Sequence, residues 1–155
     1  MLAPTENSFT VRASGGVYLY TNPSLTSGMI LPNGGSGWDA VSDRNLKDNF
    51  RDEDGEHALA AIADMPIQSW NYKAQGPSIR HMGPMAQDFY AAFGLGTDDK
   101  HINTVDIDGV NMLAIQALER RTSDLRAENE LLRARIADLE AALLRLEAAV
   151  LVRER

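Results

Sequence analysis

Two residues of types that could perform nucleophilic catalysis, Ser42 and Lys47, lie five positions apart in the first half of the chain. A serine hydroxyl is a weak nucleophile that needs a base, and a lysine whose ammonium is desolvated can supply a neutral amine for that purpose. The Val41–Ser42 peptide bond is joined covalently to the hydroxyl, so attack on the Val41 carbonyl would be intramolecular and favoured by proximity. The pair is therefore a candidate for a serine–lysine dyad that acts on its own chain.

The spacing restricts the local geometry that such a dyad needs. In a straight helix beginning at Ser42, five residues make about 1.4 turns and leave the two side chains roughly 140° apart around the axis. A dyad therefore requires a turn, or an irregular first helical turn, between Ser42 and Lys47. The same residues are also compatible with a simpler role, in which the Ser42 or Asp43 oxygen caps a helix N-terminus.

The N-terminal part of the chain is the most β-like. Residues 9–13 and 17–21 alternate apolar with polar side chains on either side of the turn signal Ser14-Gly15-Gly16, which predicts a hairpin or two short strands. Residues 29–31 form one more short apolar run. Strands this short are marginal unless other chains cover them, and an isolated β-domain is the alternative.

The middle of the chain is charged and helical. Residues 57–65 predict a helix that Pro66 ends, and residues 67–72 then alternate as a strand. Large aromatic side chains in such a strand usually belong to a core, so we expect Trp70 and Tyr72 to be buried there rather than to form a ligand platform.

A second short helix is predicted over residues 86–93. Phe89 and Phe93 are four residues apart and therefore share one helical face. Gly94 follows directly and is a typical helix stop. The segment therefore predicts a short helix with an aromatic face.

Two acidic runs, residues 52–56 and 106–109, invite a test for calcium. An EF-hand loop aligned on the glycine of either run would need acidic residues at its first and last positions, and both runs lack them. We therefore interpret both as solvated turns and expect neither a metal site nor a cofactor.

The C-terminal segment has the strongest physical pattern in the chain. From Ile115 onward apolar residues recur alternately every three and four positions, which defines a heptad register. A single helix cannot bury such a seam, so the pattern predicts a coiled coil. The a positions are Ile115, Thr122, Asn129, Ile136, Leu143 and Val150, and the d positions are Leu118, Leu125, Leu132, Leu139 and Leu146.

Charges beside the seam indicate how the helices pair. The pair Arg121–Arg126 is repulsive, and Asn129 at an a position would fix the register at some cost in stability. These heptad rules alone also allow a dimer. Two g-to-e′ pairs are opposite in sign and favour a parallel, in-register partner: Glu128–Arg133 and Arg135–Glu140.

Composition excludes several function classes. The chain has no cysteine, which rules out a disulfide framework and a cysteine-ligated metal. Its net charge is −7, and residues 42–114 contribute six basic and twelve acidic side chains, which argues against nucleic-acid binding as the main role. No apolar run approaches the roughly 20 residues of a membrane span, and residues 1–4 lack the features of a secretory signal. We therefore expect no nucleic-acid or membrane partner.

Four motifs occur in a fixed order along the chain: Ser42–Lys47 (SDRNLK), Trp70–Tyr72 (WNY), Gly83–Phe89 (GPMAQDF) and Val105–Val110 (VDIDGV). Together they resemble the intramolecular chaperone domain of phage tailspike endosialidases, the S74 peptidase family. The resemblance covers about residues 38 to 155. It extends to the self-cleaving domains of phage neck appendages and of membrane-bound myelin regulatory factors.

The resemblance implies an α+β protein in three parts. Residues 1–41 would be the C-terminal end of a β-rich fibre, residues 42–110 a chaperone and autoprotease module, and residues 111–155 the helix of a parallel, trimeric coiled coil. It further implies a homotrimer that assists folding of the upstream fibre portion of the same polypeptide and then cuts itself off. Such a chain would fold in the host cytoplasm and belong to a phage tail fibre or tailspike, or to a phage-like bacterial surface structure.

The resemblance also assigns roles to individual residues. It implies that Ser42 is the nucleophile, Lys47 the base, and Val41–Ser42 the scissile bond, with no cofactor. Burial of Lys47 by assembly would favour its neutral amine, which could then accept the Ser42 proton. Three further side chains are candidates for supporting roles such as orienting the nucleophile or stabilising an oxyanion: Asp43, His81 and Gln87.

Two other interpretations remain open. The first is a non-cleaving trimerisation cap of a fibre, in which Ser42 only caps a helix. The second is a coiled-coil adaptor whose middle domain binds a partner, which would be favoured if the N-terminal strands were stable by themselves.

Overall fold

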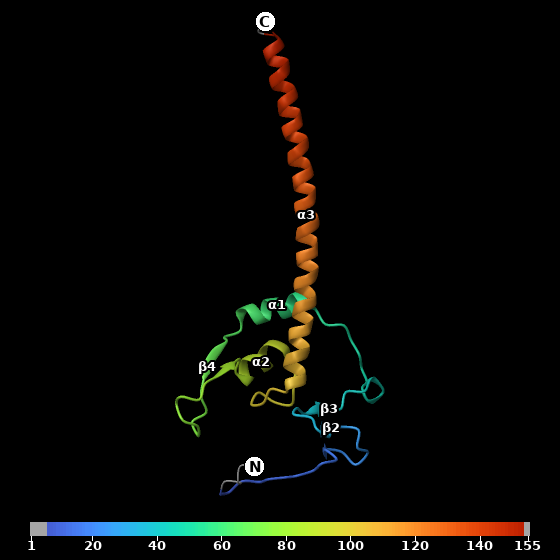
Figure 1. Ribbon diagram of the computed structural model, residues 1–155, viewed down its shortest axis with the longest axis vertical. Helices are drawn as coiled ribbons and strands as arrows, with labels where there is room; N and C mark the ends of the chain where they lie inside the picture. Colours follow the sequence, from blue (N-terminus) through green and yellow to red (C-terminus); the bar gives the residue numbers. More distant parts are fainter. Residues whose placement is uncertain (1–5, 154–155) are drawn as a thin grey trace. The chain divides into compact units, whose positions relative to one another are not determined.

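The computed structural model describes residues 6–153 and divides the chain into two compact units, one ending at Asp52 and the other beginning at Glu53. Small antiparallel sheets and a long C-terminal helix make up the fold, which confirms the expected α+β class (Figure 1). The first unit contains β1 (Val17–Tyr20), β2 (Gly28–Leu31), β3 (Asp39–Ala40) and the 3-10 helix η1 (Arg44–Leu46); the second contains α1 (Gly55–Asp64), β4 (Gln68–Trp70), β5 (His81–Gly83), α2 (Ala86–Phe93) and α3 (Thr104–Arg153).

The first unit is a three-stranded antiparallel sheet in the order β1-β2-β3. The connection between β1 and β2 is organised by Asn22, whose side-chain oxygen accepts hydrogen bonds from the backbone N–H of Thr26 at 3.0 Å and of Ser27 at 3.1 Å. Thr21 N also donates to the Ser27 carbonyl at 2.9 Å. The asparagine therefore replaces backbone partners in the turn and sets the register of the two strands.

The predicted strand over residues 9–13 is wrong. These residues lie outside every strand, and Phe9 is 94% exposed. The turn after them does form, since Gly16 N donates to the Ala13 carbonyl at 3.1 Å, but β1 pairs with β2 instead. Alternation alone does not make a strand when no partner strand lies beside it, and here the next segment along the chain provides the partner for β1.

The second unit builds its core around the N-terminal part of α3. Helices α1 and α2 contact each other, α1 packs against α3, and β4 pairs with β5 (Figure 1). The Phe89 and Phe93 rings lie 5.1 Å apart, as expected, and Gly94 ends α2 in the left-handed conformation. Most of the buried apolar side chains are small, which lets the helices approach closely. The buried residues are Ala58, Phe89, Val110, Ala114 and Ala117.

The predicted turn at residues 106–109 is wrong, because these residues lie within α3. The helix begins earlier than the predicted coiled-coil segment, and the side-chain oxygen of Asn103 accepts from Val105 N at 2.9 Å at its start. Val110 is buried and Ile107 partly buried. Burial of this apolar face therefore outweighs the turn preference of the Asp-Gly sequence.

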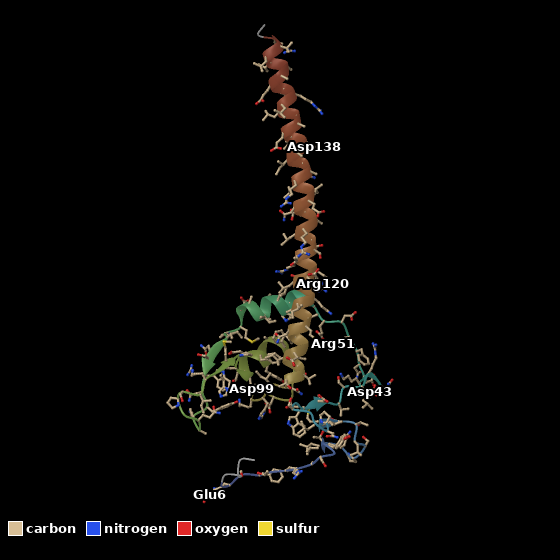
Figure 2. The ribbon with its side chains drawn as sticks, in the orientation of Figure 1. Glu6, Asp43, Arg51, Asp99, Arg120 and Asp138 are labelled. Atoms are coloured by element: carbon tan, nitrogen blue, oxygen red, sulfur yellow. The ribbon has the colours of Figure 1, made fainter. Side chains whose placement is uncertain are left out.

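The remainder of α3 extends beyond the core, and Figure 2 labels Asp138 on this part of the helix. The apolar a and d side chains from Ile115 to Val150 are between 45% and 69% exposed. Within the described residues no element covers them. A long, mostly apolar seam is therefore left in water by a single chain, and the coiled coil and its trimeric state stay predictions.

Gly55 lies where α1 and α3 approach each other closely. It is buried, and a Cβ added there would lie 2.9 Å from the Ala117 Cβ and 2.7 Å from Nη2 of Arg120, which Figure 2 labels beside the start of α1. The arginine terminus can move, but the alanine Cβ is fixed to the helix. The crossing therefore requires glycine. The residue before it, Asp54, caps α1, because its side chain accepts hydrogen bonds from Glu56 N and His57 N.

We expect Gly55→Ala to lower the free energy of unfolding by about 1–3 kcal/mol, because the added methyl overpacks the crossing. Gly109→Ala is the matched control: Gly109 lies inside α3 and an added Cβ meets no atom within 4 Å. There alanine should stabilise by about 0.5–1 kcal/mol. Urea unfolding of both variants measures the difference, and equal effects would contradict the close contact.

Candidate active site

A single 3-10 turn lies between the two residues of the predicted dyad. Asp43 caps η1: its Oδ1 accepts from Asn45 N at 2.9 Å and from Asn45 Nδ2 at 3.0 Å. Lys47 follows in extended conformation, with φ −120° and ψ 153°. The helix therefore stops after one turn, and the chain leaves it at Lys47.

This turn brings the dyad residues together. Lys47 Nζ donates to Ser42 Oγ at 2.5 Å. A longer α-helix would have kept them roughly 140° apart, so the irregular turn that the dyad requires is present. Helix capping falls to Asp43, whereas the Ser42 hydroxyl pairs with the amine.

The surroundings of the pair determine what it can do. Ser42 and Lys47 are both exposed in the single chain. Desolvation favours the neutral form of an amine, which is the form that a general base needs. The geometry suits proton transfer from Ser42 to Lys47.

The Val41–Ser42 bond lies at the boundary between the sheet and the turn. Ala40 pairs with Met29 in the ladder, and Val41 N donates to the Gly28 carbonyl at 3.1 Å. The residue that supplies the carbonyl carbon is therefore held at the end of β3, and the residue that supplies the hydroxyl begins the turn. Further along, the Arg44 guanidinium lies 5.3 Å from the Phe50 ring centroid.

His81 and Gln87 belong to the second unit. His81 lies opposite Trp70 in the β4–β5 ladder, with the two ring centroids 4.8 Å apart, and its Nε2 is 2.8 Å from Gln75 Oε1. Gln87 is exposed in the first turn of α2. His81 thus pairs with Gln75, and the supporting roles expected of His81 and Gln87 remain predictions.

The expected aromatic core of this strand is only half correct. Trp70 is partly buried and its Nε1 is shielded from solvent without a hydrogen-bond partner in the described residues. Tyr72 is 57% exposed, although its ring lies 4.8 Å from that of Trp70. Tyr72 lies past the end of β4, so one of its faces remains open to water.

Sequence reasoning missed Arg80, whose guanidinium donates hydrogen bonds to Ser69 of β4. Its Nη2 donates to the Ser69 carbonyl at 2.6 Å and to Ser69 Oγ at 2.7 Å. Arg80 and Ser69 are 11 positions apart in sequence, and this spacing belongs to no periodic pattern. Only the β4–β5 register, which places Ser69 opposite Met82, makes the contact foreseeable.

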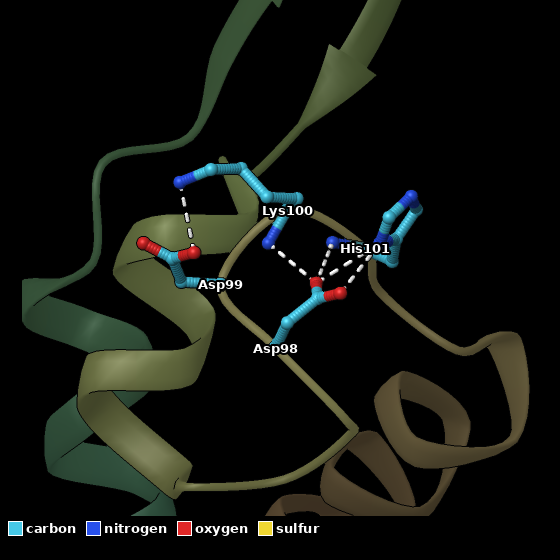
Figure 3. Close-up of polar contacts among 4 residues, drawn as sticks. All are labelled: Asp98, Asp99, Lys100 and His101. Carbon is cyan, nitrogen blue, oxygen red and sulfur yellow. Dashed lines mark hydrogen bonds and ion pairs between the residues drawn. The ribbon is translucent and has the colours of Figure 1, made fainter.

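Asp98 organises the loop between α2 and α3 (Figure 3). Its Oδ1 accepts from Lys100 N at 2.8 Å and from His101 N at 3.0 Å, and it also pairs with His101 Nδ1. The backbone bond from Lys100, and then the side-chain bond from His101, lower the pKa of Asp98 below its usual 3.8. Because these hydrogen bonds close the loop, we call Asp98 with Lys100 and His101 the Asp98 clasp. In residues 6–153 no group of three or more acidic or histidine side chains could hold a metal ion.

Comparison with known proteins agrees with the motifs. Residues 42–94 match the family model Peptidase_S74, described as the chaperone of endosialidase. This match confirms the predicted resemblance for that segment: residues 42–94 are similar to the chaperone of endosialidase, a family named as peptidases. No curated protein matches the chain. Among the described residues no helix is both long and apolar enough to cross a membrane.

The Asp98 clasp predicts a pH dependence. Since the folded pKa is below the usual 3.8, ionised Asp98 stabilises the fold above that pH, and the contribution is lost as pH falls through the lowered pKa. NMR titration should place the Asp98 midpoint below 3.8, and His101→Ala should move it upward. A midpoint at or above 3.8 in the unaltered chain would contradict the clasp.

Proposed function

We propose that residues 42–155 are a C-terminal intramolecular chaperone that assembles the upstream part of its own polypeptide as a trimer and then removes itself by cleaving Val41–Ser42. The observation that carries this proposal is the 2.5 Å contact between Lys47 Nζ and Ser42 Oγ. It supports the proposal because the pair stands at the start of the segment that matches the endosialidase chaperone family. The upstream part is then a phage-type tail fibre or tailspike.

The chemistry proceeds in two steps. The neutral amine of Lys47 takes the proton of Ser42 Oγ as the oxygen attacks the Val41 carbonyl carbon. The C–N bond breaks, the Ser42 nitrogen accepts a proton and becomes a free amine, and an ester joins Val41 to Ser42 Oγ. Water then hydrolyses the ester, which leaves a carboxylate on Val41 and restores the hydroxyl.

The exposed seam of α3 supports assembly as the trigger. Covering it requires further copies of the helix, and the opposite charges of Glu128 and Arg133 favour parallel pairing. The one repulsive pair in this register, Arg121–Arg126, is moderated within the chain, because Arg121 donates to Glu56 of α1. The choice of a trimer over a dimer rests on the family resemblance.

Three further residues are proposed to support the dyad. Asp43 holds the turn between the dyad residues through its two hydrogen bonds to Asn45. His81 and Gln87 are proposed to act on the oxyanion that forms at the Val41 carbonyl. Cleavage only after assembly would leave misassembled chains uncut, and loss of the template would make the finished fibre slow to unfold.

A non-cleaving trimerisation cap is the second candidate function. Exposure of both dyad residues in the single chain favours it, because an exposed lysine is a poor base. The two candidates share the coiled coil and differ only in the fate of the Val41–Ser42 bond.

Intact mass tests the proposed cleavage. The unaltered chain should split between Val41 and Ser42, whereas Ser42→Ala and Lys47→Ala should stay whole, with a rate lower by about 100-fold or more because the nucleophile or base is gone. Both variants should still form oligomers. Lys73→Ala, which removes an exposed lysine of the second unit, is the control and should cleave normally.

If the unaltered chain stays whole while it is an oligomer, the cap function replaces self-cleavage. If Lys47→Ala cleaves at the normal rate, Lys47 is not the base.

Neighbouring leucines test whether assembly controls cleavage. Leu132 is at d and 45% exposed, whereas Leu131 lies outside the seam and is 53% exposed. Burying a lone ammonium costs several kcal/mol, so Leu132→Lys should shift the chain to monomers and suppress cleavage. Leu131→Lys should change neither. Sedimentation and intact mass measure both effects, and normal cleavage by monomeric Leu132→Lys would contradict the coupling.

A further inference from the structure

An apolar pocket of about 230 Å³ opens in the second unit between α1, the β4–β5 sheet, α2 and α3. None of its lining residues is charged. Two of them, Met82 and Ile67, are 79% and 53% exposed, so the rim is apolar as well. A cavity of about 150 Å³ already accepts a benzene-sized group, so this pocket has room for an apolar side chain.

The pocket reaches the flank of the proposed coiled-coil seam. Because α3 is one continuous helix from Thr104, the heptad register extends toward its start, with Asn111 at d and Ile107 at g. Both residues line the pocket. A second helix lying along the seam would therefore pass beside the pocket opening.

The register identifies the residue that such a helix would present. In a parallel, in-register pair each g position faces the e position five residues later in the neighbour, as in the Glu128–Arg133 pair. The partner of Ile107 is then Met112, which is 66% exposed. Methionine is long, flexible and apolar, and it fills irregular gaps well. In an antiparallel pair g would face g′, and Met112 would lie elsewhere.

We propose that Met112 of one copy occupies the apolar pocket of its neighbour, so that each chaperone module is fastened to the helix of the next chain. This interface rests on the parallel coiled coil of the proposed function. It adds a contact between helix and module to the contacts between helices. Formation of the seam would therefore also cover the exposed pocket rim.

The absence of cysteine from the chain allows single-cysteine reporters. Met112→Cys reports the pocket, Leu125→Cys at d reports the seam, and Leu144→Cys is the matched control, since Leu144 is 66% exposed like Met112 but lies outside the seam. Each is introduced into the full chain with Ser42→Ala to prevent cleavage. A thiol reagent should modify Leu144→Cys rapidly. It should modify Met112→Cys and Leu125→Cys at least about tenfold more slowly, because burial blocks access.

The outcomes separate the two proposals. Rapid modification of Met112→Cys beside protected Leu125→Cys would overturn the pocket contact and leave the coiled coil intact. Rapid modification of both would overturn the proposed assembly itself.

A variant on the pocket side sharpens the test. Gly83 lines the pocket, and an added Cβ there meets no atom within 4 Å, so we expect Gly83→Leu to be tolerated and to narrow the pocket. It should abolish protection of Met112→Cys while Leu125→Cys stays protected. Gly76→Leu is the control, since Gly76 is equally open but lies outside the pocket lining, and it should leave protection unchanged. Protection that persists in Gly83→Leu would place Met112 outside the pocket and overturn the inference.

Discussion

An apolar stripe along α3 that a single chain leaves in water is the constraint on which the rest of this protein depends. The helix is 50 residues long, and only its N-terminal part packs against α1 and the small core. Full burial of an exposed leucine or isoleucine contributes about 1.5–3 kcal/mol, so covering this roughly half-exposed stripe would be favourable. The core of the second unit, by contrast, is made mainly of small side chains and offers little apolar area.

One face of α3 is buried within the chain and another is exposed. Val110, Ala114 and Ala117 are buried within the chain, whereas Ile115 and Leu118 are exposed, and the two sets lie roughly 100° apart around the helix. The small residues permit the close crossing with α1. The large residues stay exposed in the single chain. Under the proposed function, folding of the module therefore would not consume the surface that assembly needs.

The features that sequence predicted are those with local causes. The turn chemistry around Asp43, the stop at Gly94 and the heptads of α3 depend on neighbouring residues, and these were foreseeable. Three features depend on contacts distant in sequence and were missed: the absence of a strand at residues 9–13, the helical state of residues 106–109, and the need for glycine at Gly55. The contact between Lys47 and Ser42 was predictable only in part. The spacing showed that a dyad needs an irregular turn, but not that the chain forms one.

The local origin of the dyad has a consequence for its control. Ser42 and Lys47 are joined by a single 3-10 turn that forms within one chain, so their relative position does not require other copies. What a single chain lacks is the exclusion of water from the amine, because both residues are exposed. Under the proposed function, assembly therefore supplies desolvation rather than geometry. On that proposal the pair would act only once assembly has excluded water from it, so a fixed pair of side chains would make cleavage depend on assembly.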